Sequence, residues 1–234
     1  MRHHVRAFVV LAVGVAGCHS FQNRRPDVPI RPAQMILLPI TVMAIELDAD
    51  EARTVQEDTT DTLQTNIEAA VHAEAAARGI RVFAREMDGQ DEATKKLYGR
   101  LWGWSSKATL EIAAQATGRF DFGRQSVGDW RFPGDVAPLA AALRADTALT
   151  VYVRDTTATT GRTLLKGNIS WKKIVAACVV SLRDGRMVWC DSNVDSWGDL
   201  KNPGTAARIV NELLAGLGGP GAKVSEPAPR EPGA

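Results

Sequence analysis

Few side chains in this sequence are suited to covalent or catalytic chemistry. The 234 residues include three cysteines and four histidines. Cys18 directly follows Val15-Ala16-Gly17 near the amino terminus, whereas Cys178 and Cys190 lie in the carboxyl-terminal half. A cysteine thiol can be alkylated, can bind a metal as a thiolate, or can join a second cysteine in a disulfide. The sequence around each cysteine therefore indicates which of these reactions applies.

Cys18 ends a segment with the layout of an export signal. Met1 to Arg6 carries two arginines and no acid, and Ala7 to Ala16 is apolar apart from Gly14. This apolar run is too short to span a membrane. The order resembles a bacterial lipobox, in which the signal is cleaved between Gly17 and Cys18 and Cys18 is lipidated. Two alternatives are an ordinary secretion signal that leaves a cysteine nearby and an uncleaved amino-terminal anchor.

The lipobox resemblance implies a stable membrane anchor. Bacterial lipoproteins carry a diacylglyceryl group and often a third acyl chain. Each buried CH₂ contributes ~0.8 kcal/mol, so two or more chains hold a protein to the bilayer, whereas one chain does so only marginally. His19 stands where an aspartate retains many enterobacterial lipoproteins in the inner membrane. We therefore expect an outer-membrane lipoprotein that faces the periplasm, with surface exposure as the alternative.

Removal of residues 1–17 would leave a mature chain with one globular domain. The removed residues hold two arginines and no acid, so the formal charge changes from +1 to −1, a balance that does not indicate a nucleic-acid partner. Residues 18–33 contain three prolines without apolar periodicity, which predicts a lipidated flexible tether. Residues 218–234 are rich in glycine and proline, which predicts a disordered tail. The globular domain is expected over residues 34–217.

The apolar pattern predicts a single α/β domain with a mixed β-sheet. A continuous apolar run predicts a buried strand over 35–45, and an apolar stripe predicts a long helix over 51–78. A short strand over 80–84 completes a βαβ-type unit. Further along, we expect helices over 106–117 and 135–144, a strand over 148–154, and a loop or hairpin end over 156–163. A β-hairpin formed by 169–182 and 186–190 and a closing helix that begins at Asn202-Pro203 follow.

The turn of the hairpin determines the relation between Cys178 and Cys190. A three-residue loop over 183–185 places the two cysteines directly opposite each other, where they could form a disulfide. A four-residue loop that starts at Leu182 places them on opposite faces of the sheet, because side chains alternate along a strand. An exported protein meets an oxidising compartment, which permits the bond. Both a disulfide and two free buried thiols are compatible with the sequence.

Three segments carry a resemblance to a known group of proteins. These are residues 145–162 (ADTALTVYVRDTTATTGR), residues 179–191 (VVSLRDGRMVWCD) and the closing helix. They resemble bacterial envelope lipoproteins with a fold like the amino-terminal domain of TolB, including the curli-secretion lipoprotein and the activators of penicillin-binding proteins. The resemblance covers roughly the last third of the mature chain. It implies this fold and this compartment, and it transfers no catalytic residue.

Histidine and serine motifs supply no catalytic site. His3 and His4 leave with the signal, His19 lies in the tether, and His72 is expected on the exposed side of the long helix. Neither a G-x-S-x-G pattern nor a phosphate-binding G-x-x-x-x-G-K-[ST] pattern is present in the sequence. We therefore predict no catalytic residue and no cofactor.

The acidic run from Glu46 to Glu51 resembles the start of a calcium-binding loop. Counting from Asp48, the sixth position holds Arg53 where such loops need glycine, and the twelfth holds Thr59 where they need a bidentate glutamate. Acidic residues that precede a helix are explained by its dipole. We therefore predict no metal site here.

Tryptophan is the residue type most able to form a protein contact in this chain. All six tryptophans follow residue 100, and Trp102, Trp104 and Trp130 lie in or near the irregular middle segment. Tryptophan is enriched at the centres of protein interfaces, so these three are candidate partner-binding residues. The alternative is that they fill the core and cover the sheet.

These features together predict a non-catalytic, membrane-tethered envelope lipoprotein that binds another envelope protein or assembles with itself. One alternative is a hydrolase of cell-wall polymer that uses a carboxylate pair, which predicts a deep cleft lined with acids. A second alternative is a small-molecule carrier, which predicts a large apolar cavity.

Overall fold

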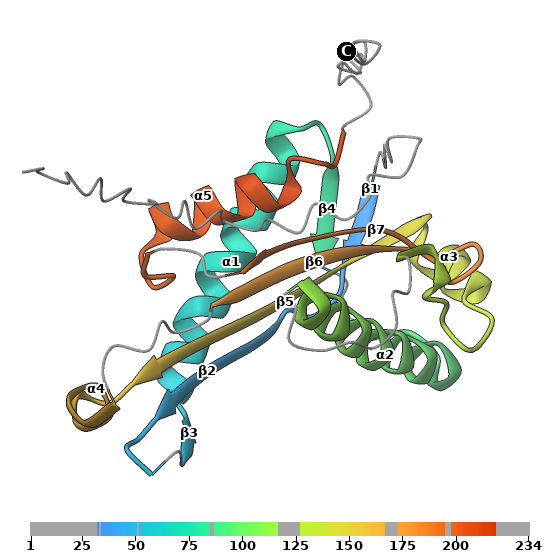
Figure 1. The fold of residues 1–234 in the computed structure, drawn as a ribbon. Helices are drawn as coiled ribbons and strands as arrows, with labels where there is room; N and C mark the ends of the chain where they lie inside the picture. Colours follow the sequence, from blue (N-terminus) through green and yellow to red (C-terminus); the bar gives the residue numbers. More distant parts are fainter. Residues whose placement is uncertain are drawn as a thin grey trace, which may run out of the picture.

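The computed structural model describes residues 32, 34–50, 52–84, 87–116, 127–166, 173–194 and 198–218 (Figure 1). Their elements, in chain order, are β1 (Gln34–Leu37), β2 (Thr41–Leu47), β3 (Arg53–Val55), α1 (Glu57–Ala77), β4 (Arg81–Ala84), α2 (Glu92–Ala116), the 3₁₀ helix η1 (Val127–Asp129), α3 (Ala137–Leu143), β5 (Thr147–Ala158), α4 (Thr160–Lys166), β6 (Ile174–Ser181), β7 (Met187–Val194) and α5 (Pro203–Leu214).

The central strand of the sheet is β5. Within the described ranges, all seven strands belong to one mixed sheet. β1 and β2 both run parallel to β5, whereas β6 pairs with it antiparallel. β4 extends the sheet beyond β1, β3 extends it beyond β2, and β7 extends it beyond β6. The predicted α/β class, βαβ unit and carboxyl-terminal hairpin are confirmed.

The strand predicted over 35–45 is divided into two parts. β1 ends at Leu37 and β2 begins at Thr41. The two strands pair one after the other with the same edge of β5. Pro39 lies in the gap, and a proline has no N–H to donate to a sheet ladder. The Leu38 N–H still donates to the carbonyl of Leu149 at 2.9 Å, which keeps the interrupted segment against β5.

One face of the sheet is covered by α1 and α5, and we call the packing between them the α1-side core (Figure 1). The predicted apolar stripe of α1 is buried throughout. α5 begins as predicted, because the side chain of Asn202 accepts hydrogen bonds from the N–H groups of Gly204 and Thr205. The stripe consists of Leu63, Ile67, Ala70, Val71 and Ala75. The buried side of the closing helix includes Ile209, Leu213 and Leu214, and Leu217, which was predicted to lie on this helix, is buried just beyond its end.

The other face is covered by α2, with η1 and α3 beside it, and we call this packing the α2-side core. α2 begins at Glu92, well before the predicted start at 106, and its two glycines obscure the helical pattern in the sequence. The Asp91 carboxylate accepts hydrogen bonds from the N–H and the hydroxyl of Thr94, and these bonds lower the pKa of Asp91.

Within the described ranges, every helix is either too short or too polar to cross a bilayer.

The acidic run predicted to enter a helix forms a turn instead. The Asp48 carboxylate accepts hydrogen bonds from the N–H groups of Asp50 and Ala52, both at 2.9 Å, and this reverses the chain. β3 then pairs antiparallel with β2, and α1 begins only at Glu57. The loop predicted over 156–163 is also different, because β5 continues to Ala158 and α4 follows.

Truncation of Leu63 should destabilise the domain strongly. Leu63 is fully buried in the α1-side core, so Leu63→Ala should lower the free energy of unfolding by about 2–5 kcal/mol. Leu164 lies on α4 and is 81% exposed, so Leu164→Ala should change stability by no more than ~0.5 kcal/mol. Urea denaturation of both variants measures the difference, and equal effects would contradict the assignment of the core.

Candidate ligand-binding pocket

A polar pocket of about 300 Å³ lies on the α1 side of the sheet, at the carboxyl ends of β2 and β5. The register between these parallel strands places Ala44 beside Asp155 and Glu46 beside Thr157. These four residues share the face that α1 covers, because side chains alternate along a strand. Crevices at the carboxyl ends of parallel strands are common ligand sites in α/β sheets.

The walls of the pocket come from three further segments. α1 contributes its N-cap residue Gln56 and Thr59 of its first turn. Lys173 precedes β6, and Asp199 and Lys201 precede α5. The pocket is thus located where the two strands extend past the beginnings of the helices that cover them.

A buried ion pair forms one side of the pocket. Asp155 is 4% exposed, and its Oδ2 lies 3.1 Å from the Nζ of Lys173. The same Nζ donates to the carbonyl of Gly198 at 2.7 Å. Oδ1 of Asp155 is also buried but has no hydrogen-bond partner among the residues that the structure describes. One oxygen of this carboxylate is therefore satisfied within the protein and the other is not.

A second carboxylate lies at the start of α1. Oε2 of Glu46 accepts a hydrogen bond from Nε2 of Gln56 at 3.0 Å, and the Gln56 N–H donates to the carbonyl of Ala44 at 2.9 Å. These bonds fix the entry of the chain into α1 against β2. No side chain caps the amino terminus of α1.

The charged lining suits the binding of a polar ligand. Three carboxylates (Glu46, Asp155, Asp199) and two ammonium groups (Lys173, Lys201) line the pocket. Within the described ranges, no group of three or more histidine, cysteine or acidic residues could hold a metal ion. The lining differs from the apolar cavity that a carrier would need, and the carboxylates come from separate strands and loops.

Sequence reasoning missed this pocket. The acidic run that contains Glu46 was interpreted as a failed calcium loop or as acids that complement a helix dipole, and the predicted strand over 148–154 ended one residue before Asp155. The available signal was an acid at the carboxyl end of an apolar strand in a chain with a predicted βαβ unit. Its partner Lys173 gave no signal, because the pairing of β5 with β6 brings the two residues together.

The hairpin contains a β-bulge that determines how its two cysteines face each other. At the turn, the Ser181 N–H donates to the carbonyl of Arg186, which leaves a four-residue loop over 182–185. Further from the turn, the register shifts so that Val188 is an extra residue in β7. Cys178 therefore lies directly opposite Cys190 despite the four-residue loop. The predicted link between loop length and cysteine orientation was wrong, because it assumed a regular ladder.

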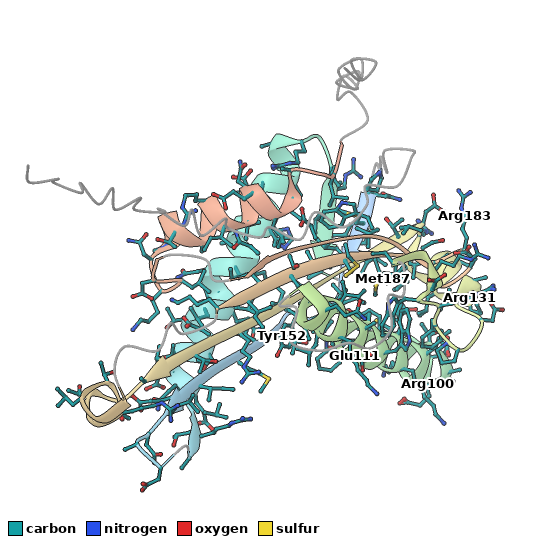
Figure 2. The ribbon with its side chains drawn as sticks, in the orientation of Figure 1. Arg100, Glu111, Arg131, Tyr152, Arg183 and Met187 are labelled. Atoms are coloured by element: carbon teal, nitrogen blue, oxygen red, sulfur yellow. A yellow bond between two sulfur atoms is a disulfide. The ribbon has the colours of Figure 1, made fainter. Side chains whose placement is uncertain are left out.

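The two cysteines lie in the α2-side core, and their sulfur atoms are joined in a disulfide (Figure 2). Gly185 ends the loop with a φ of 71°, a left-handed conformation that favours glycine. The side chain of Ser181 hydrogen-bonds the Asp184 carboxylate in this loop, and this bond lowers the pKa of Asp184. Formation of the disulfide bond in solution stays a prediction.

The three candidate tryptophans do not share one exposed surface. The ring of Trp104 packs edge-on against Phe132, with 5.8 Å between their centroids, and the Arg100 guanidinium lies over the same phenylalanine ring. Trp130 is partly buried against the α2-side core. Trp102 is 38% exposed, and it is the one of the three that is open to a partner.

Gly17 and Cys18, the predicted cleavage and lipidation residues, lie outside the described residues.

Comparison with known proteins finds structural likeness but no sequence family. The sequence matches no protein-family model and no curated protein. The lipoprotein GNA1162 from Neisseria meningitidis is 16% identical, with a TM-score of 0.32 over 70% of this chain and 79% of that one. The PelC dodecamer from Paraburkholderia phytofirmans is 12% identical, with a TM-score of 0.35 over 81% and 93% of the two chains.

The carboxyl-terminal domain of LpoB from Salmonella enterica is 10% identical, with a TM-score of 0.28 over 70% of this chain and 84% of that one. The structural likeness to these three proteins, one of which is a lipoprotein, thus has low TM-scores. At these values, no activity, partner or assembly transfers from one protein to the other.

The bond between Cys178 and Cys190 can be tested directly. We expect the unreduced, alkylated protein to yield one crosslinked pair of peptides that contain these residues, because they lie opposite each other in adjacent strands. Mass spectrometry before and after reduction measures the pair. Recovery of both cysteines as alkylated thiols without reduction would show that the bond is absent.

Removal of the Lys173 charge should destabilise the domain. Lys173→Met leaves Asp155 buried without its cation, which should lower the free energy of unfolding by about 3–5 kcal/mol. The double variant Asp155→Asn/Lys173→Met should recover much of this loss, because it leaves no unpaired charge. Denaturant titration of the single and double variants provides the comparison. A single variant as stable as the wild type would rule out a buried pair.

Proposed function

We propose that this chain is a membrane-tethered lipoprotein of the bacterial cell envelope, attached through Cys18, and that its α/β domain binds another envelope protein or assembles with itself. The main support for this proposal is the order of features over residues 1–18, which are a basic segment, a short apolar run, small residues and a cysteine. The proposed role is non-catalytic. The disulfide between two hairpin strands supports an oxidising compartment.

If residues 18–33 form the tether, one end of the domain points away from the membrane. β1 begins beside the start of β5, since Ile36 pairs with Ala148, whereas β3 and α4 lie at the other end of β5. We call this other end the distal end (Figure 1). Twelve residues of strand separate the two ends, a distance of roughly 40 Å. A tether over 18–33 would therefore leave the distal end facing away from the membrane.

Tethering reduces the contact area that a partner needs. A domain on a flexible linker meets membrane-bound partners at a high effective concentration, so modest affinity suffices. Trp102 is the candidate contact residue most open to such a partner, being 38% exposed on α2. Trp104 and Trp130 contribute to packing as well, so their substitution would also affect stability.

Replacement of Cys18 should release the protein from the membrane. In a Gram-negative host, the full chain should fractionate with the outer membrane and incorporate labelled palmitate, whereas Cys18→Ser should do neither, because serine cannot receive the thioether-linked lipid. In-cell crosslinking of both forms identifies the partner, which only the tethered form should capture efficiently. Cys178→Ser serves as the control for loss of a cysteine, and it should retain the label.

Equal membrane fractionation of the Cys18→Ser variant would contradict lipidation and indicate an uncleaved anchor. Cell-wall hydrolysis by a carboxylate pair is the alternative role. Glu46, Asp155 and Asp199 line the pocket, but its lining has no aromatic ring against which a sugar could stack. Release of soluble fragments from purified cell wall by the wild-type protein, but not by Glu46→Gln, would establish the hydrolase and overturn the non-catalytic role.

A further inference from the structure

We propose that the pocket beside Asp155 binds a primary ammonium group, carried either by a small free amine or by a lysine side chain of a peptide. The proposal does not depend on lipidation or on a protein partner. It rests on two observations: Asp155 is one of the residues that line the pocket at the distal end of the sheet, and its buried Oδ1 has no hydrogen-bond partner among the described residues.

The unpaired oxygen requires a donor from outside the described protein. A buried carboxylate oxygen without a hydrogen bond loses its hydration and gains nothing in exchange. Lys173 does not satisfy both oxygens: its Nζ lies 3.1 Å from Oδ2 and donates to the Gly198 carbonyl at 2.7 Å, and Oδ1 has no hydrogen-bond partner among the described residues. An incoming ligand with N–H or O–H groups would complete the set.

The charge of the lining favours a cation over an anion. Three carboxylates and two ammonium groups line the pocket, which leaves one excess negative charge. Glu46 uses Oε2 to accept from Gln56, and within the described ranges nothing is bonded to its Oε1. Asp155 and Glu46 project from neighbouring strands onto the same side of the sheet, so two acceptors are available to one ammonium group. An anion would instead meet the unpaired Oδ1 and be repelled.

The size and lining of the pocket restrict the ligand further. A volume of about 300 Å³ is at the lower end of small-molecule sites. Ala44 is the one apolar side chain in the lining, and there is no aromatic ring on which a sugar or a base could stack. A slender alkylammonium chain, such as a diamine or the end of a lysine, fits these properties.

Calorimetric titration of the full chain in detergent tests the proposal with three probes. 1,5-Diaminopentane represents the free amine, Nα-acetyl-lysine amide represents the peptide, and 1,5-pentanediol is the neutral control of matched length. We expect at least one amine to bind saturably at millimolar concentration and the diol not to bind. Binding of the diamine alone assigns a free amine, and binding of the lysine amide assigns a peptide.

Two pocket variants and one matched control locate the site. Asp155→Asn should weaken amine binding about tenfold or more, because it removes a charged acceptor. Glu46→Gln should weaken binding as well, and it keeps the Asp155–Lys173 pair, so it remains informative if Asp155→Asn fails to fold. Asp61→Asn makes the same charge change on an exposed position of α1 outside the pocket and should leave binding unchanged.

Three results would overturn the proposal. These are an absence of saturable binding by either amine, equal binding of the diol and the amines, and an amine affinity that neither Asp155→Asn nor Glu46→Gln lowers. In each of these cases, an ordered water molecule would be the partner of Oδ1, since a water can satisfy a buried acceptor in a polar site.

Discussion

The structure depends on the pairing of β5 along both of its edges. Its twelve residues pair with β1 and β2 on one side and with β6 on the other, so they join the early βαβ unit to the late hairpin. Most of the strand is buried on both faces. Its alternating side chains enter two separate cores, and each core has its own helices. Without this strand, neither α1 nor α2 would have a continuous surface to cover.

The two faces of β5 carry different features. On the α2 side, the sheet carries the linked cysteines beneath α2. On the α1 side, β2 and β5 extend past the first turns of α1 and α5, and the apolar side chains give way to Glu46, Asp155 and Lys173. The charges are tolerated there because Asp155 pairs with Lys173 and Glu46 accepts a hydrogen bond from Gln56. The polar site is thus a consequence of strands that are longer than their helical cover.

The sequence predicted those elements whose signals are local. The stripe of α1, the Asn202 cap of α5 and the hairpin turn each depend on residues a few positions apart, and all three are present. The first half of α2 was missed because Gly99 and Gly103 lower its apparent helix propensity, whereas burial against the sheet decides its structure. The pocket was missed because its lining residues are distant in the sequence and meet only through sheet pairing.

Because of the bulge at Val188, the pairing register at the hairpin tip differs by one residue from the register at the cysteines. Val188 and Trp189 both pack toward the α1-side core, and beyond them the alternation resumes with Cys190 on the opposite face. A three-residue tip without a bulge would bring the same cysteines into register. In that arrangement Leu182 would pair with Arg186, and the eleven residues between the cysteines would be unchanged in number. An odd number of intervening residues suits a three-residue tip with a regular ladder, whereas a four-residue tip needs one extra residue in a strand to keep the covalent link.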